Sequence, residues 1–132
     1  MRYLLDTNTI VRYLNGRVPN IRMKIDAMTP QDLATAAIVV AELRYGAAKS
    51  NNPMKTIQAQ DQFLNLIDLV DFDRNAAEIY GQIRADLEKK GTPIGPNDTL
   101  IGATAMANNL ILVTHNTREF SRIVGLQYED WE

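Results

Sequence analysis

Cysteine is absent from the 132-residue sequence, and histidine and tryptophan each occur only once. Without cysteine, the chain can form neither a disulfide framework nor a thiolate metal site. The single histidine, His115, cannot supply a set of metal ligands by itself. Any metal site must therefore be built mainly from oxygen ligands, which favour Mg²⁺ or Mn²⁺ over zinc.

Long hydrophobic runs and an excess of basic residues are also missing. No stretch approaches the roughly 18 consecutive apolar residues that a membrane span needs, and the first residues lack the basic and apolar regions of a signal peptide. We therefore expect a cytoplasmic protein with no membrane partner. The 14 Lys and Arg residues against 16 Asp and Glu residues give a net charge of −2. This balance argues mildly against a general nucleic-acid-binding protein, but not against one whose acids are concentrated in a metal site.

Short apolar segments alternate with amphipathic segments, and no repeat or linker divides the chain. We expect a single domain over residues 1–132. The pattern predicts strands at residues 3–5, 33–36, 69–72 and 110–114, a weakly signalled strand at 127–131, and helices at 7–14, 20–28, 38–49, 54–67, 75–90 and 97–108. Thr7 or Asn8 is the expected cap of the first helix. The alternation predicts an α/β domain with a mainly parallel sheet.

Four acidic residues lie at strand ends or in the first turns of the helices that follow. Asp6 ends the first strand, and Glu42 lies in an otherwise apolar helical segment after the second. Asp98 follows a loop rich in Gly and Pro and opens a helix of small residues, and Glu119 comes just after the fourth strand. In α/β folds the ligand site lies beyond the carboxyl ends of the strands, where the strand order reverses. We therefore expect these acids to meet in one crevice.

A cluster of carboxylates usually needs a cation, because buried like charges repel and raise one another's pKa. Mg²⁺ and Mn²⁺ suit phosphoryl chemistry, since they bind phosphate oxygens and help to deprotonate an attacking water. Taken singly, each residue has an ordinary explanation: Asp6 and Asp98 as helix caps, Glu42 and Glu119 as exposed charges, and His115 as a surface or capping residue. The joint placement of the acids carries the prediction.

Four segments resemble, in order, the motifs of PIN-domain ribonucleases: LLDTN at residues 4–8, AELRYG at 41–46, IGPND at 94–98 and VTHNTREF at 113–120. The spacing most resembles the VapC toxins of bacterial VapBC toxin–antitoxin pairs, and the resemblance covers essentially the whole chain. It implies a three-layer α/β/α sandwich with a four- to five-stranded sheet. It also implies a Mg²⁺- or Mn²⁺-dependent endoribonuclease that inhibits translation and growth.

The resemblance implies roles for particular residues. Asp6, Glu42 and Asp98 match the three acids common to the family and would bind the metal. Glu119 occupies the region of a fourth acid, usually aspartate, so its contact with the metal could pass through water. Asn116 would orient water or the other carboxylates.

The resemblance also implies partners. Cleavage of RNA would leave a 3′-hydroxyl and a 5′-phosphate. Transfer RNA, including the initiator species, is the expected substrate, and ribosomal RNA is another target within the family. A VapB-type antitoxin would cover the groove of the active site, and a homodimer is expected. The candidate RNA-binding residues are Thr7, Asn8, Arg12, Arg44 and Arg118.

Three other functions compete with this interpretation. A haloacid-dehalogenase-type phosphatase would need a second aspartate two residues after the first, but position 8 is Asn. A response-regulator receiver domain would need a lysine after its last strand, where His115 follows Thr114. A PIN fold kept only for protein interaction would have no activity; the four acids argue against it, and an RNA cleavage assay with and without Mg²⁺ would discriminate.

Overall fold

A computed structural model describes residues 2–132 and has a five-stranded sheet at its centre. The strands lie in the order β3-β2-β1-β4-β5, and all neighbouring pairs are parallel. They comprise β1 (Tyr3–Leu5), β2 (Leu33–Ala36), β3 (Asp68–Val70), β4 (Ile111–Val113) and β5 (Tyr128–Glu129). The predicted α/β class and parallel sheet are confirmed, including the weakly signalled fifth strand.

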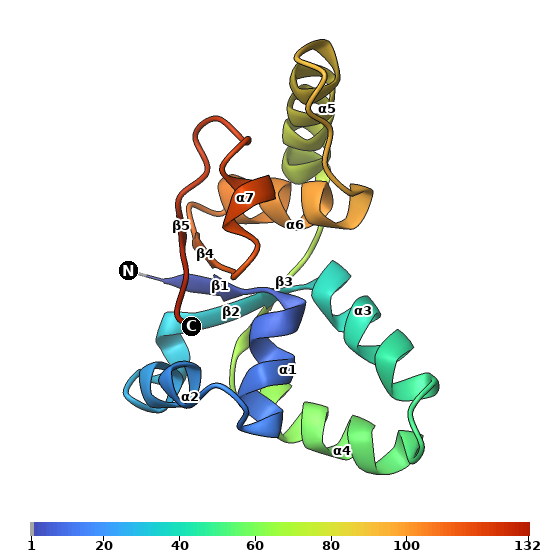
Figure 1. The fold of residues 1–132 in the computed structure, drawn as a ribbon, viewed down its shortest axis with the longest axis vertical. Coiled ribbons are helices and arrows are strands. Elements are labelled where there is room, and N and C mark those ends of the chain that lie inside the picture. The colour runs from blue at the N-terminus through green and yellow to red at the C-terminus, as the bar shows by residue number, and fades with distance from the viewer. Residues whose placement is uncertain (1) are drawn as a thin grey trace.

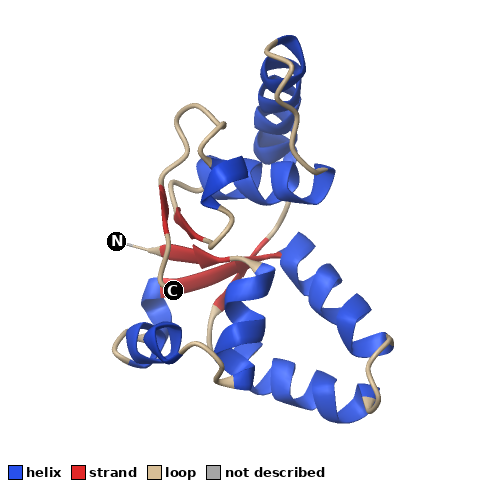
Figure 2. Cartoon of the chain, in the orientation of Figure 1, coloured by secondary structure: helices blue, strands red, loops and turns tan. Residues whose placement is uncertain are grey.

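Helices lie on both sides of this sheet, as the three-layer prediction requires (Figures 1 and 2). They are α1 (Thr7–Asn15), α2 (Pro19–Asp26), α3 (Ala37–Ala48), α4 (Pro53–Leu64), α5 (Arg74–Lys89), α6 (Pro96–Ala107) and α7 (Thr117–Phe120). In Figure 1, α1 to α4 lie on one side, and α6 and α7 lie on the other with α5 projecting beyond them. Within residues 2–132, none of these helices has the length and apolar character to cross a membrane.

The core is centred on β1 and β4, whose residues lie between the two helical layers. Leu4, Leu5, Leu112 and Val113 have no exposed surface. Interior strands of a parallel sheet are covered on both faces, which explains why these strands are continuous apolar runs rather than alternating ones. The polar side chain of Thr35 in β2 is buried because its Oγ1 donates a hydrogen bond to the Leu5 carbonyl at 2.8 Å.

The start of α1 corrects one prediction. Asp6, not Thr7 or Asn8, is the N-cap: its backbone is extended and its Oδ1 accepts a hydrogen bond from the Thr9 N–H at 2.9 Å. The helix begins at the first residue after Asp6, so the cap position falls on the residue that follows the strand. Asp is as good a cap as Asn or Ser, because its side-chain oxygen satisfies a free N–H of the first turn.

Helix α6 packs closely because of its small residues, as the sequence indicated. A Cβ on Gly102 would lie 2.9 Å from Cδ1 of Ile123, so a side chain at this position would require the end of the Ile123 side chain to shift. The short helix α7 was not predicted, since one turn is too short for an apolar period to show. The bounds of β1 and β2 are as predicted, and the other element boundaries differ from the predicted ones by at most three residues, because helix and strand ends leave only weak signals in the sequence.

Candidate active site

The carboxyl end of the sheet brings together acids from widely separated parts of the chain. Strand β1 is central, with β2 on one side and β4 on the other, so the strand order reverses beside it. A cavity of about 120 Å³ opens at this point. It is lined by Asp6, Thr7, Asn8, Glu42, Asp98, Ile101 and Asn116. Three of the four predicted acids therefore share one cavity, at the position that the topology of α/β folds predicts.

Asp6 is the most buried of these acids, with 7% of its surface exposed. Burial raises the pKa of its carboxyl group, because a charged carboxylate loses hydration there. Hydrogen bonds from Thr114 and Thr9 and the positive charge of Arg12 act in the opposite direction. Asp6 thus has a structural role as helix cap and a position in the cavity at the same time.

The pKa of Asp98, in the first turn of α6, is affected by the other three acids. Its pKa is raised to about 6, first by burial and then by the negative charges of Glu119, Glu42 and Asp6. Since a nearby like charge disfavours ionisation, this shift shows that the other three carboxylates lie close enough to act on Asp98. Glu119 does not line the cavity itself, but it belongs to the same charged cluster.

Amide and hydroxyl groups hold the carboxylates in place. Asn116 Nδ2 donates to Asp98 Oδ2 at 3.1 Å and to Glu119 Oε2 at 3.2 Å. Thr7 Oγ1 donates to Glu42 Oε1, and Asn97 Nδ2 donates to Glu42 Oε2 at 3.3 Å. No role was predicted from the sequence for Asn97 or Thr114. Asn97 lies in the motif at residues 94–98, and Thr114 lies in the motif at residues 113–120.

The donor set fits a hard divalent cation, although the side chains are not arranged as a finished coordination sphere. Over residues 2–132, no three Asp, Glu or His side chains already form a metal-binding group. Glu42 and Asp98 instead accept hydrogen bonds from Thr7, Asn97 and Asn116. The chemistry of the cluster still matches Mg²⁺ or Mn²⁺, because carboxylate oxygens are their preferred ligands and a cation would offset the repulsion that raises the Asp98 pKa.

The predicted RNA-binding residues fall into two groups. Thr7 and Asn8 line the cavity, and Arg12 lies near enough to affect Asp6 electrostatically. Arg118 is exposed on α7 beside Glu119. Arg44, in contrast, is directed towards α4, where its guanidinium binds Gln60 Oε1 at 2.8 Å and the carboxylate of Asp61.

A wider groove of about 730 Å³ adjoins the acids. Its lining comes from α1, α3, α4 and the start of α6, and is mostly apolar. It comprises Thr7, Val11, Ile38, Ala41, Glu42, Leu43, Tyr45, Gly46, Lys49, Thr56, Gln60 and Asn97. Because Thr7 and Glu42 line both hollows, the groove leads directly to the acidic cavity.

The PIN domain family matches residues 3–126 of the sequence. The chain belongs to the PIN domain family. The resemblance read from the four motifs is therefore confirmed.

Relatives within the PIN family match over almost their full length. One is the tRNA(fMet)-specific endonuclease VapC of Salmonella typhimurium, 38% identical over 99% of this chain and 98% of the relative. Another is ribonuclease VapC2 of Rickettsia felis, 38% identical over 100% of this chain and 99% of the relative.

Solved structures show the same PIN architecture. The DNA-bound VapBC complex of Salmonella typhimurium contains a chain with a TM-score of 0.93 and 38% identity, covering 100% of this chain and 99% of that one. The VapBC2 complex of Rickettsia felis, bound to a DNA fragment from its promoter, matches with a TM-score of 0.91 and 37% identity over 100% of both chains. The fold of this PIN domain is therefore that of VapC proteins.

Proposed function

We propose that this PIN domain is an RNA-cleaving endonuclease and the toxin of a VapBC-type toxin–antitoxin pair. The observation that carries the proposal is the group of four acids at the point where the strand order reverses, three of which act electrostatically on Asp98. Relatives named ribonuclease or endonuclease VapC support the reaction class. The Salmonella typhimurium relative, named for tRNA(fMet), supports transfer RNA as the substrate and the initiator species as the first to test.

In the proposed mechanism, Asp6, Asp98 and Glu42 would hold a Mg²⁺ or Mn²⁺ ion, which when bound supplies Lewis-acid activation of water and charge neutralisation at the phosphate. The chain's other polar groups keep these ligands oriented. Asn116 fixes the carboxylates of Asp98 and Glu119, and Thr7 fixes Glu42. Water attacks the phosphorus in line, the bond to the 3′ oxygen breaks, and the products carry a 3′-hydroxyl and a 5′-phosphate.

We also propose that a VapB-type antitoxin is the partner of this chain. The apolar groove between α1, α3 and α4 supports this idea, because it offers apolar surface that ends at Thr7 and Glu42 in the acidic cavity. A partner segment lying in the groove would block RNA from the acids. The solved relatives in VapBC complexes support the same partner class. The homodimer and the cytoplasmic location stay predictions.

A cleavage assay with an isosteric variant tests the proposed function. Asp98→Asn keeps the shape of the side chain but removes its charge, so we expect Mg²⁺-dependent cleavage of transfer RNA to fall by about a thousandfold or more. EDTA should abolish cleavage by the unaltered protein. Sequencing of the new 5′ ends would identify the broken bond.

The matched control is Asp73→Asn, because Asp73 caps α5 through the Ala76 N–H at 2.9 Å, and Asn caps equally well. This variant should cleave within about twofold of the unaltered protein. Undiminished metal-dependent cleavage by Asp98→Asn would sink the assignment. Failure of the unaltered protein to cleave any RNA would instead favour a PIN fold that serves only for protein interaction.

A further inference from the structure

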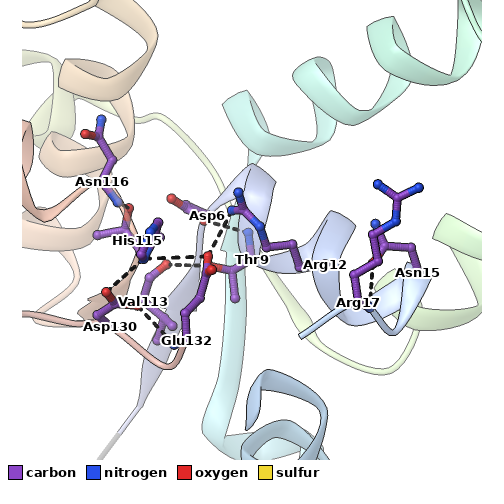
Figure 3. Close-up of polar contacts among 11 residues, drawn as sticks. Asp6, Thr9, Arg12, Asn15, Arg17, Val113, His115, Asn116, Asp130 and Glu132 are labelled. Carbon is purple, nitrogen blue, oxygen red and sulfur yellow. Dashed lines mark hydrogen bonds and ion pairs between the residues drawn. The ribbon is translucent and has the colours of Figure 1, made fainter. Parts of the chain in front are cut away.

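At the rim of the candidate active site, the carboxylates of Asp130 and Glu132 contact the side chains of Arg12 and His115 (Figure 3). Glu132 Oε2 lies 3.0 Å from Arg12 Nη1 and 3.8 Å from His115 Nδ1. His115 Nδ1 also lies 2.9 Å from Asp130 Oδ2. Because an ionised carboxylate can only accept, the proton of this hydrogen bond is on Nδ1 of His115. We call these four residues the rim cluster.

The 130–132 segment is anchored mainly through Trp131, and the Asp130 carboxylate also accepts a hydrogen bond from the Glu132 N–H at 3.0 Å. The indole of Trp131 is buried, with 2% of the residue exposed. The Trp131 carbonyl accepts from Asn20 Nδ2 at 3.0 Å, and its ring packs edge-on against Tyr3 at 5.0 Å between centroids. Since Trp131 provides the anchor, neutral residues at positions 130 and 132 would leave the segment in place.

The rim cluster lies directly beside the acidic cavity. Arg12 extends from α1 close enough to Asp6 to oppose the increase in its pKa. His115 precedes Asn116, whose amide binds Asp98 and Glu119. A group bound by Arg12 and His115 would therefore lie next to the carboxylates that the proposed mechanism uses.

The Glu132 carboxylate makes contacts that a phosphate group in the same position could also make. One carboxylate oxygen lies near both Arg12 and His115, as a non-bridging oxygen of a phosphodiester would. Arginine is suited to such oxygens because its planar fork donates several hydrogen bonds. The Arg12 side chain is 34% exposed and that of His115 is 57% exposed, so both can be reached from solvent. Partly exposed ion pairs contribute little to stability, because water and salt screen them, so a phosphate can replace the carboxylate at little cost in free energy.

We propose that Arg12 and His115 form a phosphate-binding subsite for the RNA backbone, and that Glu132 and Asp130 occupy this subsite in the RNA-free protein. RNA binding exchanges a carboxylate for a phosphate at Arg12, so the two acids weaken RNA binding. This inference rests on RNA as the substrate in the proposed function and adds both the subsite and its internal competitor.

Equilibrium binding of a labelled transfer RNA to the full chain in EDTA tests the subsite without cleavage. Glu132→Gln removes the competing charge, so we expect about fivefold tighter binding, the factor that corresponds to about 1 kcal/mol. Arg12→Gln should bind about fivefold more weakly and reduce the slope of log affinity against log salt by about one. In the Arg12→Gln background, Glu132→Gln should have no further effect, because the ion pair is already gone.

The control variant is Glu78→Gln, which removes one negative charge from an exposed site on α5 where Glu78 pairs with Arg74. It should bind RNA within about twofold of the unaltered protein, which separates the subsite from a general charge effect. If Glu132→Gln does not give a folded chain, Asp130→Asn replaces it and should also bind more tightly.

Unchanged or weaker RNA binding by Glu132→Gln, in a chain whose cleavage is intact, would overturn the subsite and leave the nuclease function standing. An equal gain from Glu78→Gln would overturn it as well. Loss of the nuclease assignment would show instead as full cleavage by Asp98→Asn, so the two failures are distinguishable.

Discussion

The acidic cavity and the rim cluster lie side by side at the carboxyl end of the sheet, but their charges are arranged in opposite ways. The cavity gathers carboxylates of one sign, and burial, followed by repulsion from the other acids, raises the pKa of Asp98 to about 6. In the rim cluster, the positive charge of Arg12 pairs with Glu132, and Asp130 has a hydrogen-bond partner in His115.

This difference indicates what each region can bind. A cluster of like charges is unfavourable by itself and becomes favourable when a cation enters, so it is suited to gain a ligand. A cluster of opposite charges is already satisfied and can only exchange one partner for another. The first arrangement suits a metal ion, and the second suits a competing phosphate.

The largest expected effect comes from removing the anchor of the rim cluster. Trp131→Ala deletes a buried indole that packs on Tyr3, so we expect the free energy of unfolding to fall by about 3–5 kcal/mol. Urea unfolding of the purified chain measures it. Val124→Ala is the control, because Val124 is 72% exposed and its change should stay within about 0.5 kcal/mol. A loss below 1 kcal/mol for Trp131→Ala would mean that the segment is not anchored as described.

A smaller effect, of opposite sign, is expected in the acidic cavity. A raised carboxyl pKa favours the protonated form in the folded chain, so the corresponding stability is present at low pH and is lost as pH rises through about 6. Asp98→Asn mimics the protonated form. In metal-free buffer at pH 7, we expect it to raise the melting temperature by about 2–4 °C.

The pH dependence sharpens this test. At pH 5, where Asp98 already holds a proton in the folded chain, the difference between the variant and the unaltered protein should shrink. Thermal unfolding followed by circular dichroism at both pH values measures the change. A melting temperature lowered by Asp98→Asn at pH 7 would contradict the account of the cavity as a repulsive cluster.

The smallest expected effect is in the rim cluster, where neutralising an acid should destabilise rather than stabilise. Glu132→Gln removes an ion pair with Arg12 whose side chains are 34% and 18% exposed, so the loss should be no more than about 1 kcal/mol. Urea unfolding at low and moderate salt measures it, and added salt should reduce the loss. If Glu132→Gln and Asp98→Asn both raise stability, the proposed contrast between the two regions is wrong.

The sequence predicted most of the fold because its signals are local. Continuous apolar runs predicted β1 and β4, which are buried on both faces, and the placement of acids after strands predicted that Asp6, Glu42, Asp98 and Glu119 would meet. The cavity at the carboxyl end of the sheet confirms this for the first three, whereas Glu119 does not line it. The metal and catalytic roles of these acids stay predictions.

Features that depend on distant contacts could not be read from the sequence. Arg12 and Glu132 lie far apart in the sequence, and the pairing of β5 with β4 and the packing of Trp131 bring them together. The pairing of Arg44 with Gln60 and Asp61 depends on how α3 and α4 pack. The cap of α1 was missed for a different reason: the helix begins one residue after β1, so the acid that faces the cavity also has to cap.

That double use of Asp6 links the assembly of the chain to its chemistry. Forming the first turn of a helix is costly, and a side chain that satisfies a free N–H lowers this cost. Asp6 supplies that bond to Thr9 only when its backbone is extended and its carboxylate is turned towards the first turn of α1. When α1 forms with this cap, the Asp6 carboxylate is therefore already oriented at the cavity. The same hydrogen bond that stabilises the first helix positions the first acid of the candidate site.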